Sequence, residues 1–158
     1  MRRWIAASVG LACAAGLAAA AMTFGRPGAE AMRLRPNDQE EVALGRSIYA
    51  EACAACHGVQ LQGQPDWQTP GPDGTLPAPP HDETGHTWHH PDKMLFTLTR
   101  DGLGALLGDD SSYISGMPAF AGQLTDAEIR ATLSYIKSTW PDDIRARHDQ
   151  INAQAAAR

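Results

Sequence analysis

The sequence predicts an all-α domain of three main helices joined by long loops rich in glycine and proline. Two capping boxes, each followed by apolar residues at helical spacing, indicate the first and the last of these helices. Between them, residues 58–85 hold 11 glycines or prolines in 28 positions, a density that no helix or central strand tolerates. A chain of 158 residues has room for one such domain and terminal extensions.

Composition and charge narrow the classes of function. The chain is 43% hydrophobic and 20% charged, as an ordinary globular protein is. Thirteen basic and 18 acidic side chains give a formal net charge of −5, and no basic patch or arm appears, so nucleic acid is not expected as a partner. The net charge favours encounter with a basic partner. No Ser/His/Asp or paired-carboxylate constellation is present, so we expect no catalytic residue.

The N-terminal residues 1–24 are predicted to direct export. Arg2 and Arg3 precede an uncharged apolar run over residues 4–24. Small residues at 19–21 offer a cleavage site, but the run of 21 residues is also long enough to span a bilayer. A cleaved signal peptide and a retained membrane anchor therefore both remain open. Either one places the rest of the chain in the periplasm or on the outer face of the cytoplasmic membrane.

The first helix is expected to follow a linker over residues 25–36, which contain Gly, Pro and Arg without periodicity. Asn37 is its predicted N-cap, with Glu40 completing a capping box. The helix is expected to reach about Ala54. Its apolar or small face recurs at spacings of 3, 4 and 3, at Val42, Gly45, Tyr49 and Ala52.

Two further helices are expected after the glycine- and proline-rich stretch. Pro91 suits the first position of the middle helix, and Gly102 suits its C-terminal cap. Residues 103–123 are predicted to form another loop. The last helix is expected to open with a capping box of Thr125 and Glu128. Its apolar face is Ile129, Leu133, Ile136 and Trp140.

The chain beyond Pro141, which ends the last predicted helix, is polar and rich in alanine. We expect residues 141–158 to be a C-terminal tail, with at most a short peripheral helix and a frayed end.

The motif Cys53-Ala54-Ala55-Cys56-His57 carries the chemistry. In Cys-x-x-Cys-His, two thiols bond the vinyl groups of haem and the histidine reaches the iron from one face. A thioredoxin-like redox pair would need a preceding strand, and zinc would usually need a second pair of ligands. The motif therefore predicts one covalently attached haem c.

Met117 is the candidate for the sixth iron ligand. It lies 60 residues after His57 in a Gly-Met-Pro loop, whereas Met94 falls on a predicted helix face and suggests core packing. Ligation by histidine and thioether raises the reduction potential and closes the iron to small ligands, which suits electron transfer. An open sixth position would instead support peroxide chemistry or gas binding, as in a haem enzyme or sensor.

Four histidines lie within ten residues beside Trp88, namely His81, His86, His89 and His90. One hypothesis is an accessory metal site, for instance for copper, which would make the chain a periplasmic metal-binding protein. Another is that His89 or His90 ligates the haem in place of Met117. The favoured interpretation is a polar surface loop packed along the haem.

The order of these features resembles that of the class I c-type cytochromes: N-terminal helix, CxxCH, loop region, middle helix, methionine loop and C-terminal helix. The resemblance covers about residues 37–140. Gly45-x-x-x-Tyr49 resembles the family's N-terminal helix motif. The stretch 133–136 resembles the C-terminal helix that crosses it at the glycine, where a small residue allows close backbone approach.

This resemblance implies a cytochrome c-like all-α domain around one covalent haem. It implies that Cys53 and Cys56 are the thioether sites and that His57 and Met117 are the axial ligands of the iron. It also implies an electron carrier between a redox protein donor and acceptor, free or as a subunit of a larger redox enzyme. The long segment 58–90 departs from the smallest family members.

Overall fold

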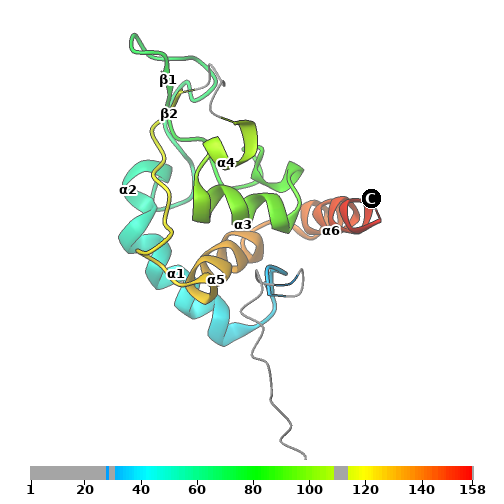
Figure 1. Cartoon of the computed structure of the whole chain (residues 1–158). Helices are drawn as coiled ribbons and strands as arrows, with labels where there is room; N and C mark the ends of the chain where they lie inside the picture. Colours follow the sequence, from blue (N-terminus) through cyan, green and yellow to red (C-terminus); the bar gives the residue numbers. More distant parts are fainter. Residues whose placement is uncertain (1–27, 29–30, 109–113, 158) are drawn as a thin grey trace, which may run out of the picture.

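Two crossing helices, α1 (Gln39–Ala52) and α5 (Asp126–Ser138), form the centre of the structure (Figure 1). The computed structural model describes residues 28, 31–108 and 114–157. The other elements are α2 (Ala54–His57), β1 (Thr75–Leu76), a 3-10 turn (Thr87–His89), α3 (Asp92–Asp101), α4 (Gly104–Leu107), β2 (Ile114–Ser115) and α6 (Asp142–Ala156). In the described residues the one sheet is the parallel pair of β1 and β2, so the all-α prediction is confirmed.

Helices α1 and α5 cross at Gly45, as predicted. A Cβ atom built on Gly45 would lie 1.9 Å from the carbonyl oxygen of Ala131. Only a hydrogen atom fits between the two backbones at that point, so glycine is required here by packing.

The core lies between α1, α3, α5 and the loops that join them. The predicted face of α5 is confirmed at Ile129, Leu133 and Ile136, which are all buried; Trp140 is also buried but lies just beyond the end of α5 at Ser138. The rest of the cluster is Leu34, Tyr49, Ala54, Leu61, Leu95, Phe96 and Phe120. On α1 the agreement is partial, because Gly45 and Tyr49 are buried but Ala52 is exposed.

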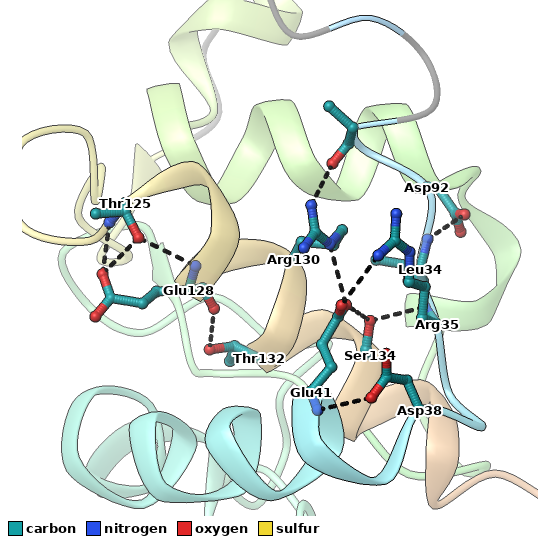
Figure 2. A network of polar contacts seen from close by, with 11 residues as sticks. Leu34, Arg35, Asp38, Glu41, Asp92, Thr125, Glu128, Arg130, Thr132 and Ser134 are labelled. Carbon is teal, nitrogen blue, oxygen red and sulfur yellow. Dashed lines mark hydrogen bonds and ion pairs between the residues drawn. The ribbon is translucent and has the colours of Figure 1, made fainter.

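The predicted N-cap of α1 is wrong by one residue. The side chain of Asp38, not Asn37, accepts a hydrogen bond from the N–H of Glu41 at 3.1 Å. Glu41 itself points inward, where its Oε1 accepts from Arg130 Nε at 3.1 Å and from Ser134 Oγ at 2.8 Å (Figure 2). These contacts tie the first turn of α1 to α5, which fixes the register of the cap. Both Asn-x-x-Glu and Asp-x-x-Glu fit the sequence pattern equally well.

The other predicted helix ends agree with the structure more closely. The capping box of Thr125 and Glu128 opens α5 as expected. Gly102 caps α3 with φ of +84°, a conformation that suits glycine, while Pro91 takes the N-cap position and not the first helical one. The expected loop 103–123 also contains the short helix α4 and strand β2.

The residues just before α1 pack against the domain, although we expected a linker over 25–36. Leu34 is buried, and its N–H donates to Asp92 Oδ2 at 2.9 Å. The N–H of Arg35 donates to Ser134 Oγ at 2.9 Å. Met32 and Leu34 are separated by Arg33, and no helical periodicity extends from them, so nothing in the sequence marked Leu34 as part of the core.

The stretch 141–158, expected to be a tail, forms the 15-residue helix α6 over most of its length. Its anchor is polar. Asn152 Oδ1 accepts from the N–H of Asp92 at 2.7 Å, and Asn152 Nδ2 donates to Asp92 Oδ1 at 2.9 Å. His148 is fully buried and lies edge-on to Trp140. A helix docked by polar side chains carries little apolar periodicity, so its length could not be read from the sequence.

His148 gives the protein a specific dependence on pH. Its Nε2–H donates to the carbonyl of His90 at 2.9 Å, which suits the neutral ring. Burial, and then the charge of Lys137 on α5, lower the pKa of His148, while Asp92 on α3, the His90 carbonyl and Asp149 on α6 oppose this shift. The folded state therefore resists protonation of His148 more than the unfolded state does.

We expect the free energy of unfolding to fall as the pH drops below about 6.5, because the unfolded chain then binds a proton that folded His148 excludes. Replacing His148 with glutamine, whose amide can still donate to the His90 carbonyl, should flatten this dependence. Urea unfolding at about pH 7 and about pH 5 measures it. The control is His89→Gln, at an exposed residue. An equal pH dependence in both variants would contradict the role of His148.

The predicted signal peptide or anchor over residues 1–24 lies outside the described residues. Within the described part of the chain, no helix has both the length and the apolar character needed to cross a membrane.

Candidate haem-binding site

The CxxCH motif lies at the end of α1 and on α2. Cys53 ends α1 and precedes α2, whose four residues are Ala54–His57. Cys53 is half-buried against the core cluster, Cys56 is exposed, and both thiols are free. Burial, and then the neighbouring Cys56, raise the pKa of the Cys53 thiol to about 11. A redox pair of the thioredoxin kind needs a lowered thiol pKa, so this environment opposes that alternative.

The imidazole of His57 is held in the orientation that a metal ligand needs. The ring is buried, and its Nδ1–H donates to the carbonyl of Pro79 at 2.8 Å. This bond fixes the tautomer and leaves the lone pair on Nε2. Burial lowers the pKa of His57, and the Pro79 carbonyl opposes the shift, so burial favours the neutral ring, which is the form that binds a metal.

Hydrogen bonds to backbone carbonyls fix the loop that follows the motif. The N–H of Gly63 donates to the carbonyl of His57 at 2.8 Å. The hydroxyl of Tyr49 on α1 donates to the carbonyl of Gly58 at 2.9 Å. The N–H of His81 donates to the carbonyl of Leu61 at 2.7 Å. The segment behind His57 is therefore ordered by α1 and by the chain that returns from the long loop.

Met117 follows β2 on the way to α5. It is half-buried and packs against the same core cluster that Cys53 contacts. Its N–H donates to Ser115 Oγ at 3.2 Å. Met94, the rival sulfur, lies on α3 and is also half-buried. Met117 and Cys53 therefore pack against the same cluster of buried apolar residues.

The family of the chain follows from a comparison with known proteins. The family model described as cytochrome c matches residues 42–140. The chain belongs to the cytochrome c family. The match begins in α1 and ends after α5, so it contains the CxxCH motif and Met117. No curated protein and no solved structure matches the chain.

Membership of the family establishes the cofactor and the general activity. The cytochrome binds covalently attached haem c and takes part in electron transfer between redox proteins. The residues of the motif fit this group: the free thiol of Cys53 precedes α2, the free thiol of Cys56 lies within it, and the next histidine has a free Nε2 with its other nitrogen hydrogen-bonded.

Each of the four histidines of segment 58–90 packs its ring against another aromatic or histidine ring. The ring of His81 stacks on that of His57 at 4.0 Å between centroids. His86 stacks on Trp67, and His89 stacks on Trp88. In the described part of the cytochrome, which includes all four, no three His, Cys, Asp or Glu side chains gather as a metal site. The hypothesis of an accessory copper site is therefore not supported.

Sequence reasoning missed Pro79, and it singled out His81 without its contact with His57. Pro79 supplies the carbonyl that orients His57, and His81 covers the face of the His57 ring. Pro79 lies 22 residues after His57, inside a stretch with many prolines. Nothing in that composition distinguishes the proline whose carbonyl meets the histidine.

Proposed function

We propose that this cytochrome is an exported electron carrier whose single haem is attached through Cys53 and Cys56 and ligated by His57 and Met117. The observation that carries the proposal is the bond from His57 Nδ1–H to the Pro79 carbonyl. It presents Nε2 of a neutral, buried histidine one residue after the second thiol of a CxxCH motif. Surface histidines do not need such an arrangement, but an iron ligand does.

The bound haem supplies the redox chemistry by cycling between ferrous and ferric iron. The residues of the chain bind and tune it. Cys53 and Cys56 hold the ring to the end of α1, so the donor and acceptor meet the haem in one fixed orientation. The Pro79 carbonyl raises the basicity of His57 through the shared proton. The thioether of Met117 would favour the reduced state and exclude small ligands.

The test is a spectroelectrochemical titration of the purified haem-loaded protein. We expect reversible one-electron behaviour, with low-spin spectra in both oxidation states and no binding of carbon monoxide by the reduced form. A high-spin spectrum or rapid binding of carbon monoxide would show an open sixth position. That result would favour the haem enzyme or gas sensor and contradict the electron carrier.

We infer that the donor and the acceptor meet the cytochrome outside the cytoplasmic membrane, in the periplasm or at the membrane surface. The basis is the export pattern of residues 1–24, two arginines followed by 21 uncharged residues. Association with the membrane through this segment is part of the same proposal. Haem-stained protein found in the soluble cytoplasmic fraction of the cells that produce the chain would contradict this location.

The charges of segment 58–90 favour a basic partner. This segment, which follows the haem motif, contains four acidic side chains and no lysine or arginine. Asp66, Asp73 and Glu83 among them are exposed. Val59, three residues after Cys56, leaves 76% of its surface exposed. It offers the partner an apolar contact beside the haem motif.

We expect electron transfer with a cationic complex such as hexaammineruthenium to slow as the ionic strength rises from about 0.01 M to about 0.5 M. The reason is that salt screens the attraction between the complex and the acidic side chains. Transfer with an anionic complex such as ferrocyanide should show a weaker or opposite dependence. The triple variant Asp66→Asn, Asp73→Asn, Glu83→Gln should reduce the slope for the cation. Stopped-flow kinetics measures both. A slope unchanged by the triple substitution would show that the segment does not steer encounter.

A further inference from the structure

We propose that residues 65–77 form a strap that holds the Met117 loop in place on the haem. The inference rests on the proposed ligation by Met117 and explains the long segment that separates the haem motif from Pro79. A loop of this length in a compact domain requires a role. Three separate attachments, at its base, its side and its returning end, show what the strap does.

The base of the strap is closed by a pair of hydrogen bonds between its two ends. The N–H of Gln64 donates to the carbonyl of Ala78 at 2.9 Å, and the N–H of Ala78 donates to Gln64 Oε1 at 2.9 Å. Gly63, with φ of +66°, passes so close to the returning chain that an added Cβ would lie 2.4 Å from the nitrogen of Pro80. The strap is therefore an excursion with adjoining ends, as in an Ω-loop. The Pro79 carbonyl that orients His57 lies just outside it.

The side of the strap is anchored by an aromatic stack. Trp67 is stacked on His86, with centroids 5.1 Å apart and an angle of 9° between the rings. The His86 ring in turn lies edge-on to the ring of His90, two residues before α3. An aromatic stack of this kind contributes beyond its buried area. This contact assigns a role to His86, which the haem site itself does not use.

The returning end of the strap pairs with the chain that leads to Met117. Gly71 and Thr75 close a turn, in which the N–H of Gly71 donates to the carbonyl of Thr75 at 2.9 Å. Strand β1 then lies parallel to β2, with Thr75 opposite Ile114 and Leu76 opposite Ser115. Figure 1 shows the strap as the green segment reaching β2 at the top of the view.

Ser115 links the strand pair β1–β2 directly to Met117. Ser115 is held by β1 through the backbone, and its Oγ accepts the N–H of Met117 at 3.2 Å. Two paired residues alone make a marginal sheet. The closed base and the Trp67 stack already order the loop that carries β1. Pairing of β1 with β2 therefore costs less conformational entropy than it would in a free loop. The strap thereby makes release of Met117 from the iron less frequent.

The rate at which imidazole binds to the ferric haem tests this inference, because imidazole must wait for Met117 to leave. We compare the wild type with Trp67→Ala and with a variant in which two glycines replace residues 65–77. The matched control is Trp88→Ala, which removes a tryptophan that stacks on His89 outside the strap. Stopped-flow absorbance follows the loss of the methionine–iron charge-transfer band.

We expect the limiting rate of imidazole binding to rise about tenfold in Trp67→Ala, because this variant loses one aromatic stack and loosens two cross-strand pairs. The excision should raise it further, Trp67→Phe should restore it, and Trp88→Ala should leave it unchanged. Wild-type rates in both strap variants, with their charge-transfer bands intact, would overturn the strap. If the excision variant does not fold, Trp67→Ala decides.

The outcome also separates the strap from the function on which it rests. A wild-type protein that lacks the charge-transfer band and binds imidazole at once would overturn the ligation by Met117, and the strap with it. A wild type with the band, and strap variants that bind imidazole no faster, would overturn the strap alone. An equal acceleration in Trp88→Ala would assign the effect to general loosening and would also count against the strap.

Discussion

Replacing Gly45 with alanine is expected to lower the free energy of unfolding by about 2 kcal/mol, the size typical of overpacking at a tight contact. The added Cβ would lie 1.9 Å from the carbonyl oxygen of Ala131, a backbone atom that cannot move unless α5 shifts. Helix propensity alone predicts the opposite sign, because alanine exceeds glycine by about 1 kcal/mol in a helix. The sign of the effect therefore separates packing from propensity.

Urea unfolding of the haem-loaded protein measures this effect, and Gly104→Ala is the matched control. Gly104 lies on α4, and an added Cβ there meets nothing within 4 Å. We expect the control to be neutral or slightly stabilising. A Gly45→Ala protein as stable as the wild type would show that α1 and α5 do not cross with their backbones in contact.

Replacing Met117 with alanine is expected to abolish the methionine–iron charge-transfer band of the ferric protein and to lower its reduction potential, because a thioether ligand favours ferrous iron. The vacant position should also let the reduced protein bind carbon monoxide. Haem attachment should persist, because Cys53 and Cys56 lie on a different segment, Cys53 at the end of α1 and Cys56 on α2. Absorption spectroscopy and potentiometric titration measure these changes.

The matched control for this substitution is Met94→Ala on α3. Both methionines are half-buried, so each substitution shortens a partly buried side chain. We expect Met94→Ala to retain the band and the wild-type potential. Loss of the band in Met94→Ala with retention in Met117→Ala would assign the ligand to α3 and contradict the role proposed for Met117.

Much of the helical core was predictable from the sequence. The capping box at Thr125 and the apolar face of α5 predicted that helix correctly, because local hydrogen bonds and helical periodicity determine both. The close approach at Gly45 was also predicted, and the structure confirms it. These features depend on neighbours in sequence or on one pair of crossing helices.

The features that were missed depend on contacts between distant segments. Helix α6 docks through Asn152 and His148, whose partners lie in another part of the chain, so its sequence showed only a polar stretch. The cap at Asp38 was displaced by the contacts of Glu41 with α5. The inner structure of segment 58–90 depends on turns and stacks for which glycine and proline content gives no pairing rule.

The same limit applies to the haem site. The CxxCH motif is local, so three of its proposed residues could be named from five consecutive positions. Pro79 and His81 reach His57 only through the fold of the long loop. Met117 was proposed from its loop context, and the structure adds its packing against the core cluster and its link to β2.

Mass spectrometry of the purified, denatured cytochrome tests whether the chain carries one covalent haem c on its CxxCH motif. We expect one haem per chain that survives denaturation, located on the peptide containing Cys53 and Cys56, with both cysteines bonded to it. Cys53→Ser and Cys56→Ser variants should each retain at most one thioether bond, and the double variant should carry no covalent haem. A chain expressed with a haem-attachment system that still carries no haem on this peptide, or carries it elsewhere, would contradict the account.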